Sequence, residues 1–414
     1  MRFFTSLLLT FSGLLLSWSL YGQTFTNYTT LDGLASDNTN CVAVDVNDNL
    51  WIGTQSGVSY YDRLNWTTHD QASDSGLVDN NITAITATTT GNIWVGTSFG
   101  ASVYDGSSWT GYTTVDGLGN NQVKYIAEAP NGNIWFGTIM GVSVFDGSNW
   151  TNYGTNDGIP FGGVDHIEVA TNGNIWLSGS LGGAIEYDGN TFTVYTDTDG
   201  LFNNKVRAIE EDASGNKWIG TSDGITVYDA NNQFSANHTR LFTLPAPDTL
   251  NPVEDVKVDS RGLVWAGIYV DYLVTEGGVS YWDGSVWHEF DVSDGLAGPV
   301  VRRIAIDSND DVWVATSTGV SQISGIVVGN TPVHEQANFR LYPNPASKEI
   351  HIRLEERIPS ELSNIALYDL KMEKVMEWRV SKGELDITLE IPSLPKGLYF
   401  LNLGNEYRKI LIGQ

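Results

Sequence analysis

Short apolar runs separated by turn-forming residues occupy most of the chain. Residues 123–153 show the pattern well, because four runs are separated there by turns rich in glycine, asparagine or aspartate. The runs are VKYIA at residues 123–127, IWFGT at 134–138, GVSVF at 141–145 and WTNY at 150–153. Glycine and asparagine readily adopt the positive φ of tight hairpin turns. The pattern therefore predicts four short antiparallel strands joined by hairpins.

This unit is one of seven. A tryptophan followed by a small-residue turn recurs at Trp51, Trp94, Trp135, Trp176, Trp218, Trp265 and Trp313. The steps between successive tryptophans are 43, 41, 41, 42, 47 and 48 residues. Four short strands at this period are typical of a propeller blade, so the sequence predicts an all-β, seven-bladed β-propeller. Tryptophans at a fixed place in every unit are interpreted as blade-to-blade packing rather than as ligand contacts.

The two ends of the repeat region complement each other. The seventh unit stops after its third run, and residues 25–28 (FTNY) match the fourth run of the third unit (WTNY). We therefore expect the N-terminal run to complete the last blade and close the ring, which removes the exposed edge of an open sheet.

Four segments are expected along the chain. Residues 1–22 predict a signal peptide, with Arg2 before an apolar run at residues 7–20, and a membrane anchor is the alternative. Residues 23–324 form the predicted propeller, and residues 325–338 are a linker. Residues 339–414 contain short alternating strands, which predict a small β-sandwich. No transmembrane segment is expected after the signal peptide is removed.

The net charge and its distribution along the chain exclude one class of binding partner. The net charge is −27, and residues 1–338 hold 11 of the 22 basic and 38 of the 49 acidic residues. A surface so acidic argues against nucleic acid, because phosphate contacts need lysine and arginine. Cys41 is the single cysteine and lies in a strand-like run, so we interpret it as a core residue rather than a reactive thiol.

The inner strands hold the candidate site. Eleven residues before each repeated tryptophan lie Asn40, Thr83, Lys124, Asp165, Arg207, Glu254 and Arg302, which predict a polar ring at the mouth of the central channel. His166 and Arg303 are sequence neighbours of this ring. Three interpretations stay open: mutual pairing of these charges, a pocket for an anionic or sugar-like ligand, or catalysis. In the last, His166 would act as base while arginine or lysine stabilises an enolate.

Two further features are candidates for binding. The sixth unit contains an insertion in which Tyr269 and Tyr272 could either stack on a sugar or cover the edge of the ring. Aspartate-rich turns at residues 45–49 and 307–311 suggest calcium loops, but both coincide with a hairpin turn and lack the following glutamate of an EF-hand. We therefore expect no cofactor, with calcium as the alternative.

The repeat resembles a known family. The pattern D-G-L-x-x-N-x-V, then G-N-x-W-x-G-T, then G-V-x-x-Y-D is similar to the two-component-regulator propeller repeat, found in sensor halves of hybrid histidine kinases and in secreted proteins of Bacteroidota. Kinase and response-regulator parts are absent, so the resemblance does not imply phosphotransfer. Some secreted propellers with similar repeats look like lyases, which keeps an enzymatic alternative open.

The C-terminal segment resembles a second family, the type A sorting domain of the type IX secretion system. The matching residues are Tyr342, Pro343, Asn344 and Pro345, the later Gly397, and Lys409 near the end. The resemblance implies recognition by that secretion machinery and a place outside a Gram-negative cell, secreted or on its outer-membrane surface. The sequence thus predicts a recognition or scaffold module for an unknown glycan, small anion or surface protein. The alternative is a lyase-like extracellular enzyme.

Overall fold

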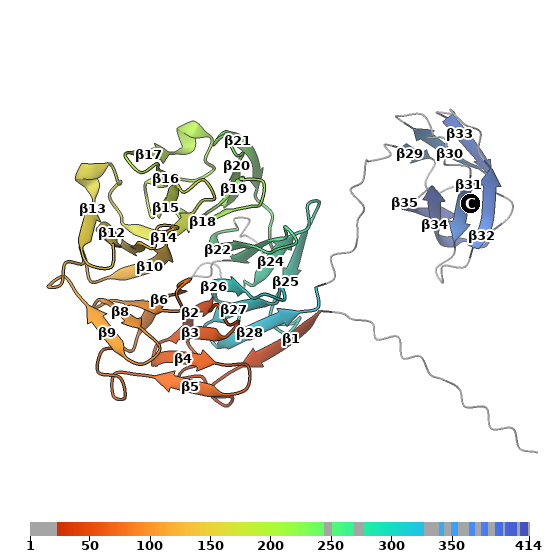
Figure 1. The fold of residues 1–414 in the computed structure, drawn as a ribbon. Helices are drawn as coiled ribbons and strands as arrows, with labels where there is room; N and C mark the ends of the chain where they lie inside the picture. The colour runs from red at the N-terminus through yellow and green to blue at the C-terminus, as the bar shows by residue number, and fades with distance from the viewer. Residues whose placement is uncertain are drawn as a thin grey trace, which may run out of the picture. The chain divides into compact units, whose positions relative to one another are not determined.

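The computed structural model describes residues 23–243, 251–268, 277–326, 339–342, 349–354, 364–368, 374–379, 386–391, 394–403 and 406–412. The chain divides into two compact units, Met1–Val328 and Gly329–Gln414. The first unit consists of seven four-stranded sheets arranged as blades around a central channel (Figure 1). The predicted all-β, seven-bladed propeller is therefore confirmed. No helix within the described ranges is long and apolar enough to cross a membrane.

Blades 1 to 4 follow one another along the chain. Blade 1 contains β2 (Thr39–Val44), β3 (Leu50–Thr54), β4 (Gly57–Tyr61) and β5 (Trp66–His69). Blade 2 contains β6 (Ile82–Ala87), β7 (Ile93–Thr97), β8 (Ala101–Tyr104) and β9 (Trp109–Tyr112). Blade 3 contains β10 (Val123–Glu128), β11 (Ile134–Thr138), β12 (Gly141–Phe145) and β13 (Trp150–Tyr153), with η1 (Thr155–Asp157) after it. Blade 4 contains β14 (Val164–Val169), β15 (Ile175–Gly179), β16 (Gly183–Tyr187) and β17 (Phe192–Tyr195), followed by η2 (Asp197–Asp199).

Blades 5 to 7 complete the ring. Blade 5 contains β18 (Val206–Glu211), β19 (Lys217–Thr221), β20 (Gly224–Tyr228) and β21 (Phe234–His238). Blade 6 contains β22 (Val253–Val258), β23 (Val264–Ile268), β24 (Val279–Trp282) and β25 (Trp287–Phe290). Blade 7 contains β26 (Val301–Ile306), β27 (Val312–Thr316), β28 (Gly319–Ser324) and the N-terminal strand β1 (Thr24–Tyr28). The first strand of each blade lies innermost, so β2, β6, β10, β14, β18, β22 and β26 line the channel (Figure 1).

The N-terminal strand closes the ring as predicted. β1 pairs antiparallel with β28, with Phe25 opposite Ile323 and Tyr28 opposite Val320. The ring of Tyr28 stacks on that of Trp313 at 5.6 Å between centroids. Because the first and last parts of the propeller share one sheet, blade 7 has no unpaired third strand.

The repeated tryptophans are part of the core. The second strand of every blade is buried along its whole length, and all seven tryptophans are at most 8 % exposed. In four blades the indole N–H donates to an aspartate six residues earlier: Trp51 to Asp45, Trp218 to Asp212, Trp265 to Asp259 and Trp313 to Asp307, at 2.9 to 3.4 Å. Blades 2, 3 and 4 have Thr88, Ala129 and Ala170 at the matching position. The tryptophans therefore stabilise the blades, as the fixed spacing predicted.

The second unit is a small β-sandwich. One sheet contains β29 (Phe339–Tyr342), β30 (Glu349–Leu354) and β33 (Asp386–Glu390). The other, in spatial order, contains β32 (Lys374–Arg379), β31 (Asn364–Tyr368), β34 (Gly397–Leu403) and β35 (Glu406–Ile412). Ile350 and Leu389 from the first sheet share one core with Ile365 and Leu401 from the second. Alternating apolar residues thus place one face of each sheet in the core, as predicted for this segment.

Candidate functional site: a polar cavity at the channel mouth

A repeated backbone irregularity gathers the predicted ring of polar residues. Where the innermost strand of each blade pairs with the second strand, the register shifts by one residue, as in a β-bulge. The residues passed over are Asn40, Thr83, Lys124, Asp165, Arg207, Glu254 and Arg302. Such a shift turns a side chain out of the strand's normal alternation. All seven side chains therefore face the channel.

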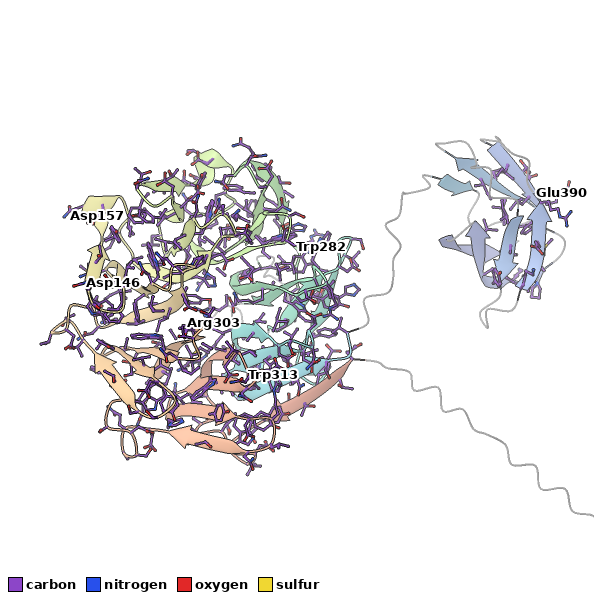
Figure 2. The ribbon with its side chains drawn as sticks, in the orientation of Figure 1. Asp146, Asp157, Trp282, Arg303, Trp313 and Glu390 are labelled. Carbon is purple, nitrogen blue, oxygen red and sulfur yellow. The ribbon has the colours of Figure 1, made fainter. Side chains whose placement is uncertain are left out.

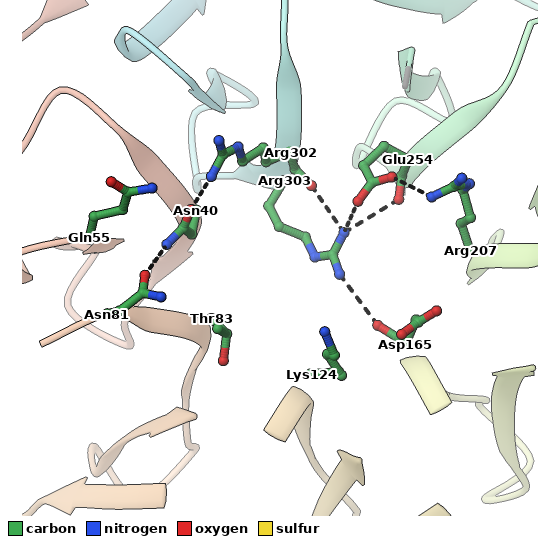
Figure 3. A pocket seen from close by; sticks show the side chains of 10 residues that line it. All are labelled: Asn40, Gln55, Asn81, Thr83, Lys124, Asp165, Arg207, Glu254, Arg302 and Arg303. Atoms are coloured by element: carbon green, nitrogen blue, oxygen red, sulfur yellow. Dashed lines mark hydrogen bonds and ion pairs between the residues drawn. The ribbon is translucent and has the colours of Figure 1, made fainter. Parts of the chain in front are cut away.

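These seven residues, which we call the mouth ring, line one cavity of about 450 Å³ together with Gln55, Asn81 and Arg303 (Figure 3). Gln55 comes from the turn between β3 and β4, so the cavity opens on the face where second strands end and third strands begin. The structure thus brings the whole predicted ring to one place. It adds two amides, Gln55 and Asn81, that the spacing from the tryptophans did not identify.

Part of the charge in the cavity is internally paired. Glu254 accepts from Arg207, with Oε2 and Nη1 3.2 Å apart, and its Oε1 lies 3.6 Å from Nη1 of Arg303. Asp165 accepts a hydrogen bond from the hydroxyl of Ser180. The prediction that ring charges pair with one another is therefore met for Glu254.

Two cations lack a carboxylate partner. Lys124 is exposed and, within the described residues, no carboxylate lies within ion-pair distance of it. Arg302 donates to the amide oxygen of Asn40, whose nitrogen in turn donates to Asn81 at 3.1 Å (Figure 3). The cavity holds four cations and two carboxylates, in a chain whose net charge is −27. A local excess of positive charge attracts anions.

Arg303 forms the base of this cavity. It lies at the centre of the propeller, where its Nη2 reaches across the channel from blade 7 to the backbone oxygen of Asp165 in blade 4, at 3.3 Å (Figure 2). Its guanidinium carbon lies 5.5 Å from the ring centroid of Tyr125 in blade 3. Arg303 and Tyr125 also line a second cavity of about 250 Å³, together with Asp255 and Lys257. Arg303 lines both cavities and therefore lies between them.

His166 corrects an expectation. Its side chain is fully buried and does not line the mouth cavity, because the register shift turns Asp165 towards the cavity and places the next residue against Tyr125. The two rings lie 4.1 Å apart, and Nε2 is 3.7 Å from Oδ1 of Asp255. Burial, with Lys257 and Arg303 close by, holds the pKa of His166 well below its usual value. The structure therefore places His166 behind the mouth ring and not at the channel mouth, where it was expected.

A buried charge cluster next to His166 was missed by the sequence analysis. Lys257 donates to Glu210 at 2.6 Å, and burial together with the carboxylate of Glu210 raises the pKa of Glu168 to about 8. These three residues lie eight positions before the tryptophans of blades 4 to 6. Listing the residue eight positions before each repeated tryptophan, as was done eleven positions before it for the mouth ring, could have identified them.

Only some of the remaining predicted residues lie within the described part of the chain. Tyr269 and Tyr272 lie outside the described residues. Of the sorting-motif residues, Tyr342, Gly397 and Lys409 lie in β29, β34 and β35, whereas Pro343, Asn344 and Pro345 lie outside the described residues. Gly397 pairs with Ile412, which joins the start of β34 to the end of β35.

The aspartate-rich turns form turn hydrogen bonds. Oδ1 of Asp45 accepts from the backbone N–H of Asn47 and Asn49, and Oδ1 of Asp307 does the same for Asn309 and Asp311. No group of three or more metal-ligating side chains occurs in the part of the chain that the structure describes. The expectation of no cofactor stays a prediction, with calcium as the alternative.

Comparison with protein families identifies both units. Residues 340–412 match the model of the secretion system C-terminal sorting domain. Residues 76–99 and 117–140 match the two component regulator propeller. The chain therefore carries two-component-regulator propeller repeats and a type IX sorting domain, which directs it to the cell surface or into the medium.

Solved structures share the fold. The extracellular domain of BT3049 from B. thetaiotaomicron, described as a hybrid two component system, has a TM-score of 0.60 at 18% identity, covering 94% of this chain and 59% of that one. PorZ, a surface component of the type-IX secretion system of Porphyromonas gingivalis, has a TM-score of 0.57 at 16% identity over 94% of this chain and 61% of that one.

A third similar structure is an enzyme. A streptogramin B lyase has a TM-score of 0.57 at 10% identity, covering 73% of this chain and 97% of the lyase. At such identities the likeness concerns the fold alone. This chain spans about three fifths of the first two relatives. No curated protein sequence matches it significantly.

Proposed function

We propose that this exported propeller is a recognition module that holds the carboxylate of a small hydroxylated anion, such as an acidic sugar, in the mouth cavity. One observation carries the proposal: Lys124 and Arg302 face a cavity without a carboxylate partner among the described residues, although the chain is strongly acidic. An anionic ligand would supply the missing charge. Charge-assisted hydrogen bonds from lysine and arginine to carboxylates are stronger than neutral ones.

The neutral side of the cavity supports a hydroxylated ligand. Asn40, Gln55, Asn81 and Thr83 come from blades 1 and 2 and offer amide and hydroxyl groups. Amides both donate and accept hydrogen bonds, as the hydroxyls of a sugar require. Arg303 is held by Glu254 and by backbone oxygens, so the base of the cavity is already ordered before a ligand binds. Such preorganisation lowers the entropic cost of binding.

The enzymatic alternative has less support. A lyase shares the fold. However, no histidine is among the residues that line the mouth cavity, and His166 is fully buried outside it. Recognition without turnover is therefore the function that this site supports best. Mass spectrometry of the ligand after incubation tests the alternative: a product that disappears with His166→Ala would establish catalysis.

The binding proposal is tested by calorimetric titration of the full chain with galacturonate and with galactose. We expect galacturonate to bind and galactose to bind at least tenfold more weakly, because a charged hydrogen bond contributes about 1.5–3 kcal/mol. Lys124→Gln and Arg302→Gln should each weaken galacturonate binding by roughly tenfold or more. Lys205→Gln is the matched control, because Lys205 is exposed but does not line the cavity. Unchanged affinity in both cavity variants would refute the proposal.

A further inference from the structure

Large apolar side chains are exposed together beside the mouth cavity. Ile139, Met140, Phe161 and Leu181 are exposed by 36, 63, 81 and 66 %. We call these four residues the apolar rim. Contiguous exposed apolar surface on a soluble protein usually marks an interaction site.

The rim is contiguous because its three segments pack on one another. Residues 160–163 run between the turn after β11 and the turn after β15. A Cβ atom on Gly163 would lie 2.7 Å from the Cα of Ile139, and one on Gly162 would lie 3.6 Å from the Cβ of Leu181. Glycine at both positions therefore lets the loop that carries Phe161 pack between the two turns.

The turns that carry Met140 and Leu181 belong to adjacent blades. At the turns that carry Met140 and Leu181 in blades 3 and 4, the matching residues of the other described blades are mostly polar, with Phe99 of blade 2 as the exception. The polar pairs are Gln55-Ser56, Ser222-Asp223 and Ser317-Thr318. The repeat itself therefore does not require apolar residues at this turn. Their presence in adjacent blades marks one edge of the channel mouth.

The rim is joined to the mouth ring through Ser180. Ser180, which precedes Leu181, donates its hydroxyl hydrogen bond to Asp165 of the mouth ring. Gln55, from the equivalent turn of blade 1, itself lines the cavity. A ligand longer than one sugar would therefore extend from the cationic cavity over the rim.

We propose that the mouth cavity and the apolar rim form one docking surface for a polypeptide segment in which a carboxylate side chain lies beside apolar side chains. The inference rests on the proposed function, since the carboxylate would occupy the same cavity. Charge complementarity orients the segment, with its carboxylate at Lys124 and Arg302 and its apolar side chains on Phe161 and Leu181.

The character of the rim favours apolar polypeptide side chains over further sugar units beside the carboxylate. Three of its four residues are isoleucine, methionine and leucine, which pack well against apolar side chains but lack the flat face on which a sugar ring stacks. Phenylalanine and methionine are typical of protein interfaces. Because the chain as a whole carries −27, the flanks of the segment should be neutral or basic. A second copy of this chain is disfavoured for the same reason.

The test uses fluorescence anisotropy with a library of short labelled peptides. Each has one aspartate or glutamate between leucine, isoleucine or phenylalanine residues, and a control library has asparagine or glutamine instead. We expect binding from the acidic library only, with competition by galacturonate. Phe161→Ser and Leu181→Ser should each weaken peptide binding by roughly tenfold, as for central interface residues, and leave galacturonate binding unchanged.

Leu64→Ser is the matched control, because Leu64 is 85 % exposed in the turn between β4 and β5, at the opposite end of its blade. It should leave peptide binding unchanged. If galacturonate binds but no acidic peptide does, or if Phe161→Ser affects oligogalacturonate rather than peptides, the inference is overturned and the proposed function stands. If neither galacturonate nor peptides bind, both fail.

Discussion

Blades 2 to 4 differ from blades 5, 6, 7 and 1 in how their tryptophans are held. In the second group the indole N–H of each repeated tryptophan donates to a turn aspartate: Asp212, Asp259, Asp307 and Asp45. In the first group threonine or alanine replaces the aspartate. The indole nitrogen of Trp176 in blade 4 is buried and has no hydrogen-bond partner among the described residues.

The difference shows that the fold requires the buried tryptophan but not its hydrogen bond to an aspartate. Tryptophans of both groups are equally buried, so packing closes the blades with or without the aspartate. Two of the blades without it, blades 3 and 4, also carry the apolar rim, which the repeat does not require. The proposed docking surface therefore combines a repeated position, the mouth ring, with residues that depart from the repeat, the apolar rim.

The largest expected effect on stability follows from replacing an aspartate that accepts a hydrogen bond from a repeated tryptophan. Oδ2 of Asp307 accepts from Trp313 at 2.9 Å and from Arg63 at 3.0 Å, and its side chain is fully buried. Asp307→Ala would leave the buried indole N–H of Trp313 without its acceptor and Arg63 with Asp48 as its remaining carboxylate partner, and should lower the free energy of unfolding by about 2–3 kcal/mol. Thr88→Ala at the matching place in blade 2 should cost about 1 kcal/mol. Denaturant unfolding of the full chain measures both, and equal losses would contradict the comparison.

A second effect should depend on pH, at the boundary between the two groups. Glu168 of blade 4 faces Glu210 and Lys257, and its pKa is raised to about 8, chiefly by burial. An unfolded glutamate has a pKa of about 4.3. Between these values the folded state binds more protons than the unfolded state, so stability falls as pH rises through this window.

Glu168→Gln removes this titration. The stability of the variant relative to the parent chain should therefore increase from about pH 5 to about pH 8. Denaturant midpoints across this range give the readout. Parallel curves for the two proteins would show that Glu168 is ionised in the folded state.

The smallest expected effect is a gain in stability. Ala170→Asp places in blade 4 the aspartate that blade 5 has at Asp212, and it should give the indole N–H of Trp176 an acceptor. We expect the free energy of unfolding to rise by about 1 kcal/mol, the usual net contribution of one hydrogen bond. Ala170→Asn is the control for charge. A loss of stability in both would show that blade 4 has no room for the side chain.

The blades and the mouth ring could be predicted because both repeat. A step of 41 to 48 residues between tryptophans predicted seven blades, and a fixed offset from them predicted seven channel-facing residues, including Lys124 and Arg302. The burial of His166 could not be predicted, because it depends on a one-residue register shift. The hydrogen bond from Arg303 to the backbone oxygen of Asp165, 138 residues away, could not be predicted either, because no local sequence pattern encodes a contact across the channel.

The central claim is that Lys124 and Arg302, which have no carboxylate partner among the described residues, bind an anion. Titration of the full chain with galacturonate at low and at high salt tests it most directly. The account predicts saturable binding that Lys124→Gln weakens roughly tenfold and that added salt weakens in the parent chain, because salt screens exposed charges. Binding that is unaffected by Lys124→Gln, Arg302→Gln and salt, or no binding of any carboxylate, would contradict it.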